Sequence, residues 1–155
     1  MTSELTIVGA SVRAAAQSAA RAGFAVRSGD LFADVDLCRT CPATRVVDYP
    51  RGLASVVAGD QAGGWMYTGG LENEPELIAQ MASRRRLWGN GERVLRMVRQ
   101  PWNVMRALRA SGLLSPEVAQ CHDKIPCDGS WLRKRLRSAG GTDVSPWHGH
   151  HQEPE

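Results

Sequence analysis

The first candidate for chemistry is the segment WLRKRLRSAGGTDVSPW, residues 131–147. Lys134 lies in a stretch that is typical of a strand, and Ser138, Gly140 and Gly141 follow it closely. A lysine held by a strand beside a loop of small residues can bind phosphate, because the ammonium offsets charge and the loop amides can approach the oxygens. A turn between two strands explains the same residues equally well. A P-loop is excluded, because G-x-x-x-x-G-K-S/T does not occur.

A second candidate lies near the start of the chain, where an apolar stretch runs into Gly9-Ala10-Ser11. The dinucleotide-binding pattern G-x-G-x-x-G is incomplete here, because Ser11 replaces the glycine that lets the backbone approach a pyrophosphate. Asp30 lies at about the distance along the chain where an acid contacts a ribose. Two interpretations follow: nucleotide binding at this turn, or a tight strand-to-helix turn, which the residues favour.

Cysteine and histidine raise the question of a metal site. Cys38 and Cys41 have the spacing of zinc ligands, and Cys121 and Cys127 could complete four thiolates. The second pair is more widely spaced than zinc motifs are, so free thiols are favoured. Three histidines gather near the C-terminus: His148, His150 and His151. A polar chain end is favoured over a metal-binding tail there, and the sequence predicts no metal site.

The elements that must position these residues alternate between strand and helix. Strands are predicted at residues 4–11, 24–32, 44–50, 63–70, 86–91 and 130–136. Helices are predicted at 11–23, 52–61 and 73–85, followed by an arginine-bearing helix that breaks at Pro101 and a second helix that ends at Gly112. This alternation is typical of a doubly wound α/β fold with a parallel sheet.

Ligands of such sheets gather at the carboxyl ends of the strands. Small and polar residues follow the predicted strands at those ends, and we expect six of them to contact a small-molecule ligand: Gly9, Ser11, Thr68, Gly69, Glu72 and Asn73. Tyr67 lies beside them in the sequence. These residues form the second candidate site, a pocket at the strand ends.

Charge and composition limit the function classes. The net charge is +3, and eight arginines lie within residues 84–109. In the same region Leu95, Val98, Trp102, Met105 and Leu108 recur at helical spacing, which predicts one buried stripe with the arginines on the solvated side. No nucleic-acid partner is therefore predicted.

Length and apolar patterning predict a soluble chain. Its 155 residues can form one ordinary domain with a real core. No apolar run reaches the roughly 18 residues of a membrane span. The N-terminal residues carry no basic segment of a secretory signal. A cytoplasmic protein without a membrane partner is expected.

Taken together, the chain resembles the N-terminal part of ATP-grasp proteins, in particular ATP-dependent carboligases related to biotin carboxylase. The resemblance is carried by IVGASVRAAAQSAARAG, DLFADVDL, WMYTGGLENEPELI, LWGNG, SPEV and WLRKRLRSAGG, spread over residues 5–141. It implies a Rossmann-like pre-ATP-grasp domain at residues 1–113, followed at 116–155 by part of the first ATP-grasp lobe with a disordered C-terminal tail.

The resemblance also implies a reaction and its ligands. Lys134, Ser138, Gly140 and Gly141 match the strand lysine and the loop that hold the phosphates of ATP, with magnesium as a further cofactor. The family activates a small-molecule carboxylate as an acyl phosphate, which an amine or a similar nucleophile then attacks. Two departures are Arg135, where the family usually has proline, and Asp143, where it has glycine.

Three functions follow. The first is a fragment of such a ligase, which lacks the second lobe, is inactive alone and self-associates through a sheet edge left exposed near Lys134. The second is a free-standing nucleotide-binding or protein-interaction module that uses the strand-end pocket. The third is a small NAD(P)-binding Rossmann protein that uses the first turn and Asp30.

Overall fold

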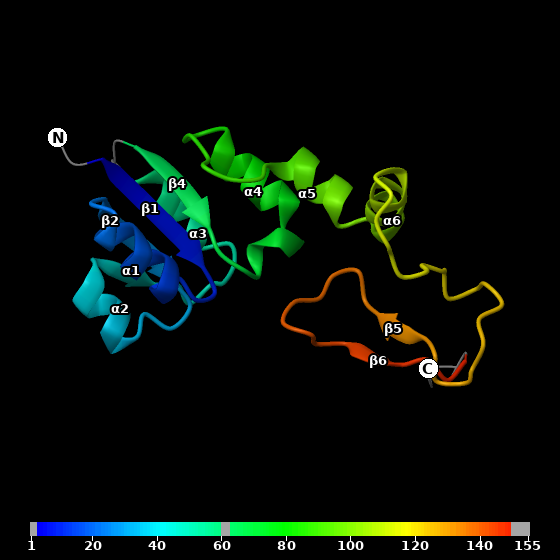
Figure 1. Ribbon diagram of the computed structural model, residues 1–155. Helices are drawn as coiled ribbons and strands as arrows, with labels where there is room; N and C mark the ends of the chain where they lie inside the picture. The colour runs from blue at the N-terminus through cyan, green and yellow to red at the C-terminus, as the bar shows by residue number, and fades with distance from the viewer. Residues whose placement is uncertain (1–2, 60–62, 150–155) are drawn as a thin grey trace. The chain divides into compact units, whose positions relative to one another are not determined.

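The computed structural model describes residues 3–59 and 63–149 (Figure 1). The chain divides into two compact units, Met1–Leu95 and Arg96–Glu155, which we call the N-terminal and C-terminal units. This division falls earlier in the chain than the predicted boundary at residues 113–116. Each unit has a sheet of its own.

A four-stranded parallel sheet organises the N-terminal unit. Its strands are β1 (Glu4–Gly9), β2 (Ala25–Asp30), β3 (Ala43–Arg45) and β4 (Gly64–Tyr67), in the order β3-β2-β1-β4. The predicted α/β class with a parallel sheet is confirmed. Along the chain, β2 and β3 are added on one side of β1, and β4 is then added on the other side of β1. The β1–β4 boundary is thus the point where the strand order reverses, which is where parallel sheets bind ligands.

Helices cover both faces of this sheet (Figure 1). They are α1 (Arg13–Arg21), α2 (Val35–Thr40), α3 (Leu53–Ala58) and α4 (Pro75–Ala82). Side chains of β1 alternate between the two faces, as the pleat of a strand requires. Leu5 and Ile7 belong to one buried cluster with Val12 and Ala16 beside α1. Val8 belongs to the other cluster, which contains α3 and α4 residues.

Local signals account for several helix boundaries. The helix α1 ends before Gly23, whose φ of +87° suits the predicted C-terminal stop. Pro75 occupies the first turn of α4, where its missing N–H costs nothing. After α5 (Glu92–Val98), Pro101 likewise begins α6 (Pro101–Ala110), and Gly112 follows with φ +72°. The predicted break at Pro101 and stop at Gly112 are confirmed.

The single buried stripe predicted along the arginine-bearing region is wrong. Leu95 is buried, but Val98 is 49% exposed and no residue of α6 is buried. Trp102, Met105 and Leu108 are only partly covered. The reason is the break at Pro101, which interrupts the helical repeat before the stripe is complete.

Several short elements differ from the prediction. The strand β3 is shorter than 44–50, and residue Leu87 makes a single bridge to Trp65 in place of the strand predicted at 86–91. The helix α2 and the 3-10 turn η1 (Leu71–Asn73) were not anticipated. Asp34 begins α2 by accepting a hydrogen bond from the Leu37 N–H, which is an ordinary N-cap signal.

The C-terminal unit contains one antiparallel hairpin. Its strands are β5 (Leu132–Lys134) and β6 (Val144–Pro146), with Leu132 opposite Pro146 and Lys134 opposite Val144. The strand predicted at 130–136 is confirmed in its centre, whereas β6 was not predicted. Within the described residues, no helix combines the length and apolar character needed to cross a membrane.

Candidate functional site

Lys134 is the last residue of β5, and the loop of residues 135–143 leads from it to β6. The structure confirms a loop between two strands, preceded by a strand lysine. Phosphate binding by this loop stays a prediction. The Lys134 side chain is exposed. An ammonium in this position can reach an anion that lies over the loop.

Hydrogen bonds hold the first half of the loop in shape. The Arg99 guanidinium donates to the carbonyl oxygens of Leu136, at 2.8 Å, and Ser138, at 3.3 Å. The hydroxyl of Ser138 donates to the Arg135 carbonyl at 3.0 Å. Arg99 was not anticipated as part of this site, because α6 and a long irregular segment separate it from the loop in sequence. Its contacts turn a basic side chain toward the loop that carries Ser138.

Gly140 and Gly141 form the tip of the loop with φ +62° and +78°. A side chain at either position would meet no atom within 4 Å, so crowding does not exclude one. Glycine is favoured because of the positive φ angles, which other residues rarely adopt. Open space at the tip lets a ligand approach the backbone. Asp143, with φ +59°, ends the loop and brings the only carboxylate of residues 131–147.

The charge of the hairpin is strongly positive. Four cationic side chains lie within five successive residues: Arg133, Lys134, Arg135 and Arg137. Asp143 offsets one of these charges. A segment with this excess attracts an anion before any specific contact forms.

The carboxyl ends of β1 and β4 form the strand-end site. The Thr68 N–H donates to the Val8 carbonyl at 3.0 Å, and its hydroxyl donates to the Ser11 carbonyl at 3.1 Å. A side chain at Gly9 would collide with the Thr68 hydroxyl. The structure thus brings together Gly9, Ser11 and Thr68, which the sequence predicted as ligand contacts.

The remaining predicted contacts follow β4 directly. Gly69 has open space where a side chain would be. Gly70 has a φ of +100°, and its N–H donates a hydrogen bond to the Glu72 carboxylate. Asn73 is the last residue of the turn η1. Glu72 therefore shapes the turn as well as placing a negative charge at the strand ends.

Asp30 does not have the role that the dinucleotide pattern implies. It is 2% exposed, and its carboxylate accepts the N–H groups of Val12, at 2.8 Å, Phe32, at 2.7 Å, and Ala33, at 2.8 Å. The Val12 N–H lies at the start of α1, where a pyrophosphate would bind in a dinucleotide-binding protein. The Asp30 carboxylate thus occupies the place that a pyrophosphate would take, which supports the interpretation of the first turn as structural.

Two tyrosines near the strand ends differ in their hydrogen bonding. The Tyr67 hydroxyl donates to the Asn90 carbonyl at 2.7 Å. The Tyr49 hydroxyl lies against Gly70 and is buried without a partner among residues 3–59 and 63–149. Sequence reasoning placed Tyr49 in the strand predicted at 44–50 and did not connect it with this site, whereas in the structure it lies after β3 in an irregular segment.

Both hydroxyls remain protonated at neutral pH. Burial, followed by the charges of Glu72 and Glu74, raises the pKa of Tyr49. Burial, followed by the charge of Glu72, raises the pKa of Tyr67. Glu72 and Glu74 thus place negative charge near the strand ends.

The pair gives a matched test of the structure. Tyr49→Phe is expected to leave the free energy of unfolding unchanged or raise it by about 1 kcal/mol, because it removes a buried hydroxyl without a partner. Tyr67→Phe is expected to lower it by about 1 kcal/mol, because it breaks a hydrogen bond. Urea unfolding followed by circular dichroism measures both. Equal losses for the two variants would show that the Tyr49 hydroxyl has a partner.

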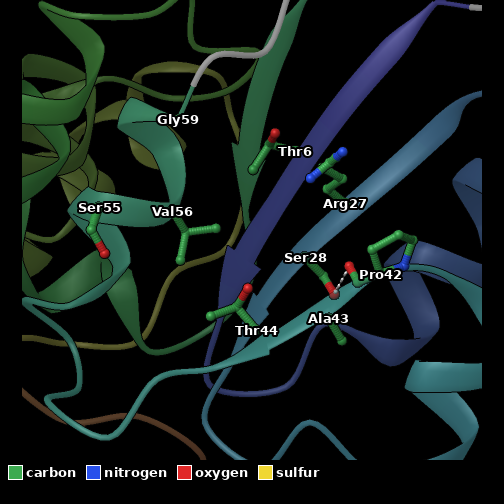
Figure 2. A pocket seen from close by; sticks show the side chains of 9 residues that line it. All are labelled: Thr6, Arg27, Ser28, Pro42, Ala43, Thr44, Ser55, Val56 and Gly59. Atoms are coloured by element: carbon green, nitrogen blue, oxygen red, sulfur yellow. Dashed lines mark hydrogen bonds between the residues drawn. The ribbon is translucent and has the colours of Figure 1, made fainter.

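Two cavities in the described part of the N-terminal unit bear on the candidate sites. One, of about 270 Å³, lies between the sheet and α3, where Thr6 of β1 and Arg27 of β2 stand beside each other near Val56 (Figure 2). The other, of about 720 Å³, is lined by Tyr49, Arg51 and Glu74 among others. The larger one extends the strand-end site, because Tyr49 belongs to both.

The cysteines are all free, and only Cys41 is buried. In the described part of the chain, no group of three or more histidine, cysteine, aspartate or glutamate side chains is arranged to hold a metal ion. His148 is exposed, and His150 and His151 lie outside the described residues.

Comparison with protein-family models, curated proteins and solved structures finds no match to this chain. Its function therefore has to be argued from the two candidate sites. The hairpin offers cations and open amides, and the strand-end site offers hydroxyls and a carboxylate.

Proposed function

We propose that the chain belongs to an ATP-dependent ligase of the ATP-grasp kind, in which the β5–β6 hairpin binds the triphosphate. The observation that carries the proposal is the position of Lys134, which ends a strand directly before a loop whose tip is Gly140-Gly141. The arginines around it add positive charge. The reaction would activate a carboxylate as an acyl phosphate, which an amine or similar nucleophile attacks.

Each part of the hairpin has a physical task in this proposal. The Lys134 ammonium offsets the charge of the phosphoryl groups, and the N–H groups at Gly140 and Gly141 approach their oxygens. Arg99 keeps the carbonyl oxygens of Leu136 and Ser138 occupied, so that the loop presents fewer acceptors to an anion. Fixed donors of this kind need no reorganisation when charge moves.

Magnesium is implied by the resemblance, but the described residues do not fit it. They bring no three carboxylate, histidine or cysteine side chains together. The carboxylate nearest in sequence to the glycines, Asp143, is a single one. The proposal therefore gives no step to a metal ion held by the described residues.

The strand-end site supports a second function, a small-molecule binding module in the N-terminal unit. The meeting of Gly9, Ser11 and Thr68 at the point where the strand order reverses favours it. The carboxylates of Glu72 and Glu74, which lie near the two tyrosines at the strand ends, suit a cationic group. Within the ligase, this site would bind the amine substrate more readily than the acid.

Titration of the protein with ATP, inorganic tripolyphosphate and NADH tests these functions. Tryptophan fluorescence reports binding, since Trp131 and Trp147 flank the hairpin strands. Saturable changes with ATP and tripolyphosphate, and none with NADH, are expected. A response to NADH alone would refute the proposal and restore the first turn as a nucleotide site.

The charge of Asp143 gives a further prediction. Asp143→Asn is expected to tighten ATP binding by about two- to fivefold at low salt, because it removes an exposed like charge that solvent partly screens. Asparagine tolerates the left-handed backbone of this position, so the loop should keep its shape. Isothermal titration calorimetry measures the change. Asp48→Asn in the N-terminal unit removes the same charge and should have no effect, whereas equal tightening in both would indicate a general effect of net charge.

A further inference from the structure

A cavity in the C-terminal unit has mainly apolar walls. It measures about 900 Å³ and lies within residues 101–147. Its lining includes three tryptophans and three aliphatic side chains: Trp102, Trp131, Trp147, Leu132, Leu136 and Val144. Its volume falls within the range of about 300–1,000 Å³ that small-molecule sites have. The cavity can hold the body of an apolar ligand.

The wall formed by the hairpin combines apolar side chains with two cations, Arg133 and Lys134. Leu132 and Lys134 lie two residues apart in β5, so their side chains project from the same face of the strand. Val144 pairs with Lys134 across the hairpin and joins the same lining. Lys134 thus places an ammonium at the end of an apolar surface.

In the described residues, no carboxylate of the cavity lining forms an ion pair with the Lys134 ammonium. Glu117, which also lines it, forms an ion pair with Arg109 at 2.6 Å. Within residues 3–59 and 63–149, no carboxylate lies within ion-pair distance of Lys134. A ligand that complements the cavity therefore has an apolar body and an anionic end.

We infer that this cavity binds the acid substrate, and that the substrate is an apolar carboxylic acid of the aromatic class. Stacking on tryptophan favours a ring, and Lys134 gives the carboxylate a charge-assisted hydrogen bond. A purine base fits less well, because its ring nitrogens require hydrogen-bond partners and the walls are mainly apolar. A neutral ligand would gain nothing from Lys134.

This inference rests on the proposed function and deepens it. With the triphosphate and the carboxylate both at Lys134, a carboxylate oxygen attacks the γ-phosphorus. The new O–P bond forms as the bond to the β-phosphate oxygen breaks, which yields the acyl phosphate and ADP. The Lys134 ammonium offsets charge on both reactants.

Calorimetry on the full chain with 2-naphthoate and its neutral analogue 2-naphthamide tests the inference. The acid should bind at least about tenfold more tightly than the amide, which corresponds to one charge-assisted contact. Lys134→Ala should reduce acid binding to the level of the amide, and Lys134→Arg should retain most of it. Equal binding of acid and amide to the unaltered protein would overturn the inference.

A second pair of variants locates the ligand. Leu132→Ala should weaken both compounds by about fivefold or more, because it removes apolar contact area. Leu132 is 65% exposed in the free protein, so the variant should still fold. Leu114→Ala, at a fully exposed position outside the lining, should leave both affinities unchanged. Equal effects of the two variants would place the ligand elsewhere and contradict the inference.

Two further outcomes separate the inference from the proposed function. If the protein binds tripolyphosphate but not naphthoate, the inference is overturned and the proposed function stands. If it binds naphthoate but neither ATP nor tripolyphosphate, the proposed ligase function is overturned and an acid-binding cavity remains. Sedimentation of the free protein tests whether a second copy of the chain occupies the cavity. A dimer that Leu132→Ala dissociates would show that a second copy occupies the cavity, which also overturns the inference.

Discussion

Replacing Asp30 with alanine is expected to lower the free energy of unfolding of the N-terminal unit by about 3–5 kcal/mol, because three buried or half-buried N–H groups lose their acceptor. Those groups belong to Val12, Phe32 and Ala33. The carboxylate joins the end of β2 to the start of α1 and to the turn after β2. Its loss therefore affects two connections of the sheet at once.

Urea unfolding followed by tryptophan fluorescence measures this loss. Trp65 is fully buried in the core of the N-terminal unit and reports its unfolding. Asp34→Ala is the control, because Asp34 accepts one N–H group, from Leu37, and is exposed enough to ion-pair with Arg13 at the surface. It should cost about 1 kcal/mol. A loss for Asp30→Ala no larger than for the control would show that water replaces the carboxylate easily.

The second large effect concerns ATP binding. Lys134→Ala is expected to weaken it by about 10- to 100-fold, since a charge-assisted hydrogen bond contributes about 1.5–3 kcal/mol and each 1.4 kcal/mol is a factor of ten. The variant should fold normally, because the side chain is exposed and ends a strand. Calorimetry at fixed ionic strength measures the affinity.

The chain contains a matched control for this experiment. Lys124 is its only other lysine and is also exposed. Lys124→Ala changes the net charge by the same amount, so it should alter ATP affinity by less than about twofold once salt screens long-range charge. If both variants lose affinity equally, the triphosphate responds to net charge and has no site at the hairpin.

The parallel sheet could be predicted from the sequence because its strands carry strong local signals. The strand β1 is mainly apolar and ends at Gly9, and β4 ends at Tyr67 directly before Thr68. Their alternation with helices predicts that the strands are parallel. The residues Gly9, Ser11 and Thr68 could be expected to meet for the same reason. Parallel strands place their carboxyl ends at one edge of the sheet.

Short elements and long-range partners could not be predicted in this way. The strand β6 has three residues and includes Pro146, so its pairing with β5 and not its composition makes it a strand. Tyr49 reaches Gly70 through a segment without periodicity. Asp30 had the spacing of a ribose contact, but spacing does not reveal that three N–H groups of the chain occupy its carboxylate.

The sheet edges bear on the predicted self-association. In the described residues the C-terminal sheet has two strands, so each has one edge without a partner strand, and both strands carry an exposed apolar side chain, Leu132 and Val144. Exposed edges with apolar side chains favour pairing with another chain. Self-association stays a prediction, which sedimentation of the free protein tests.

Protection of the two lysines from acylation tests the central claim most directly. The protein is treated with a limiting amount of an amine-reactive acetyl ester, with and without ATP, and labelling is measured by mass spectrometry of peptides. Saturating ATP is expected to slow labelling of Lys134 by about tenfold, in line with one charge-assisted contact, and to leave Lys124 unchanged. Equal labelling of Lys134 with and without saturating ATP would contradict the assignment of the hairpin as the triphosphate site.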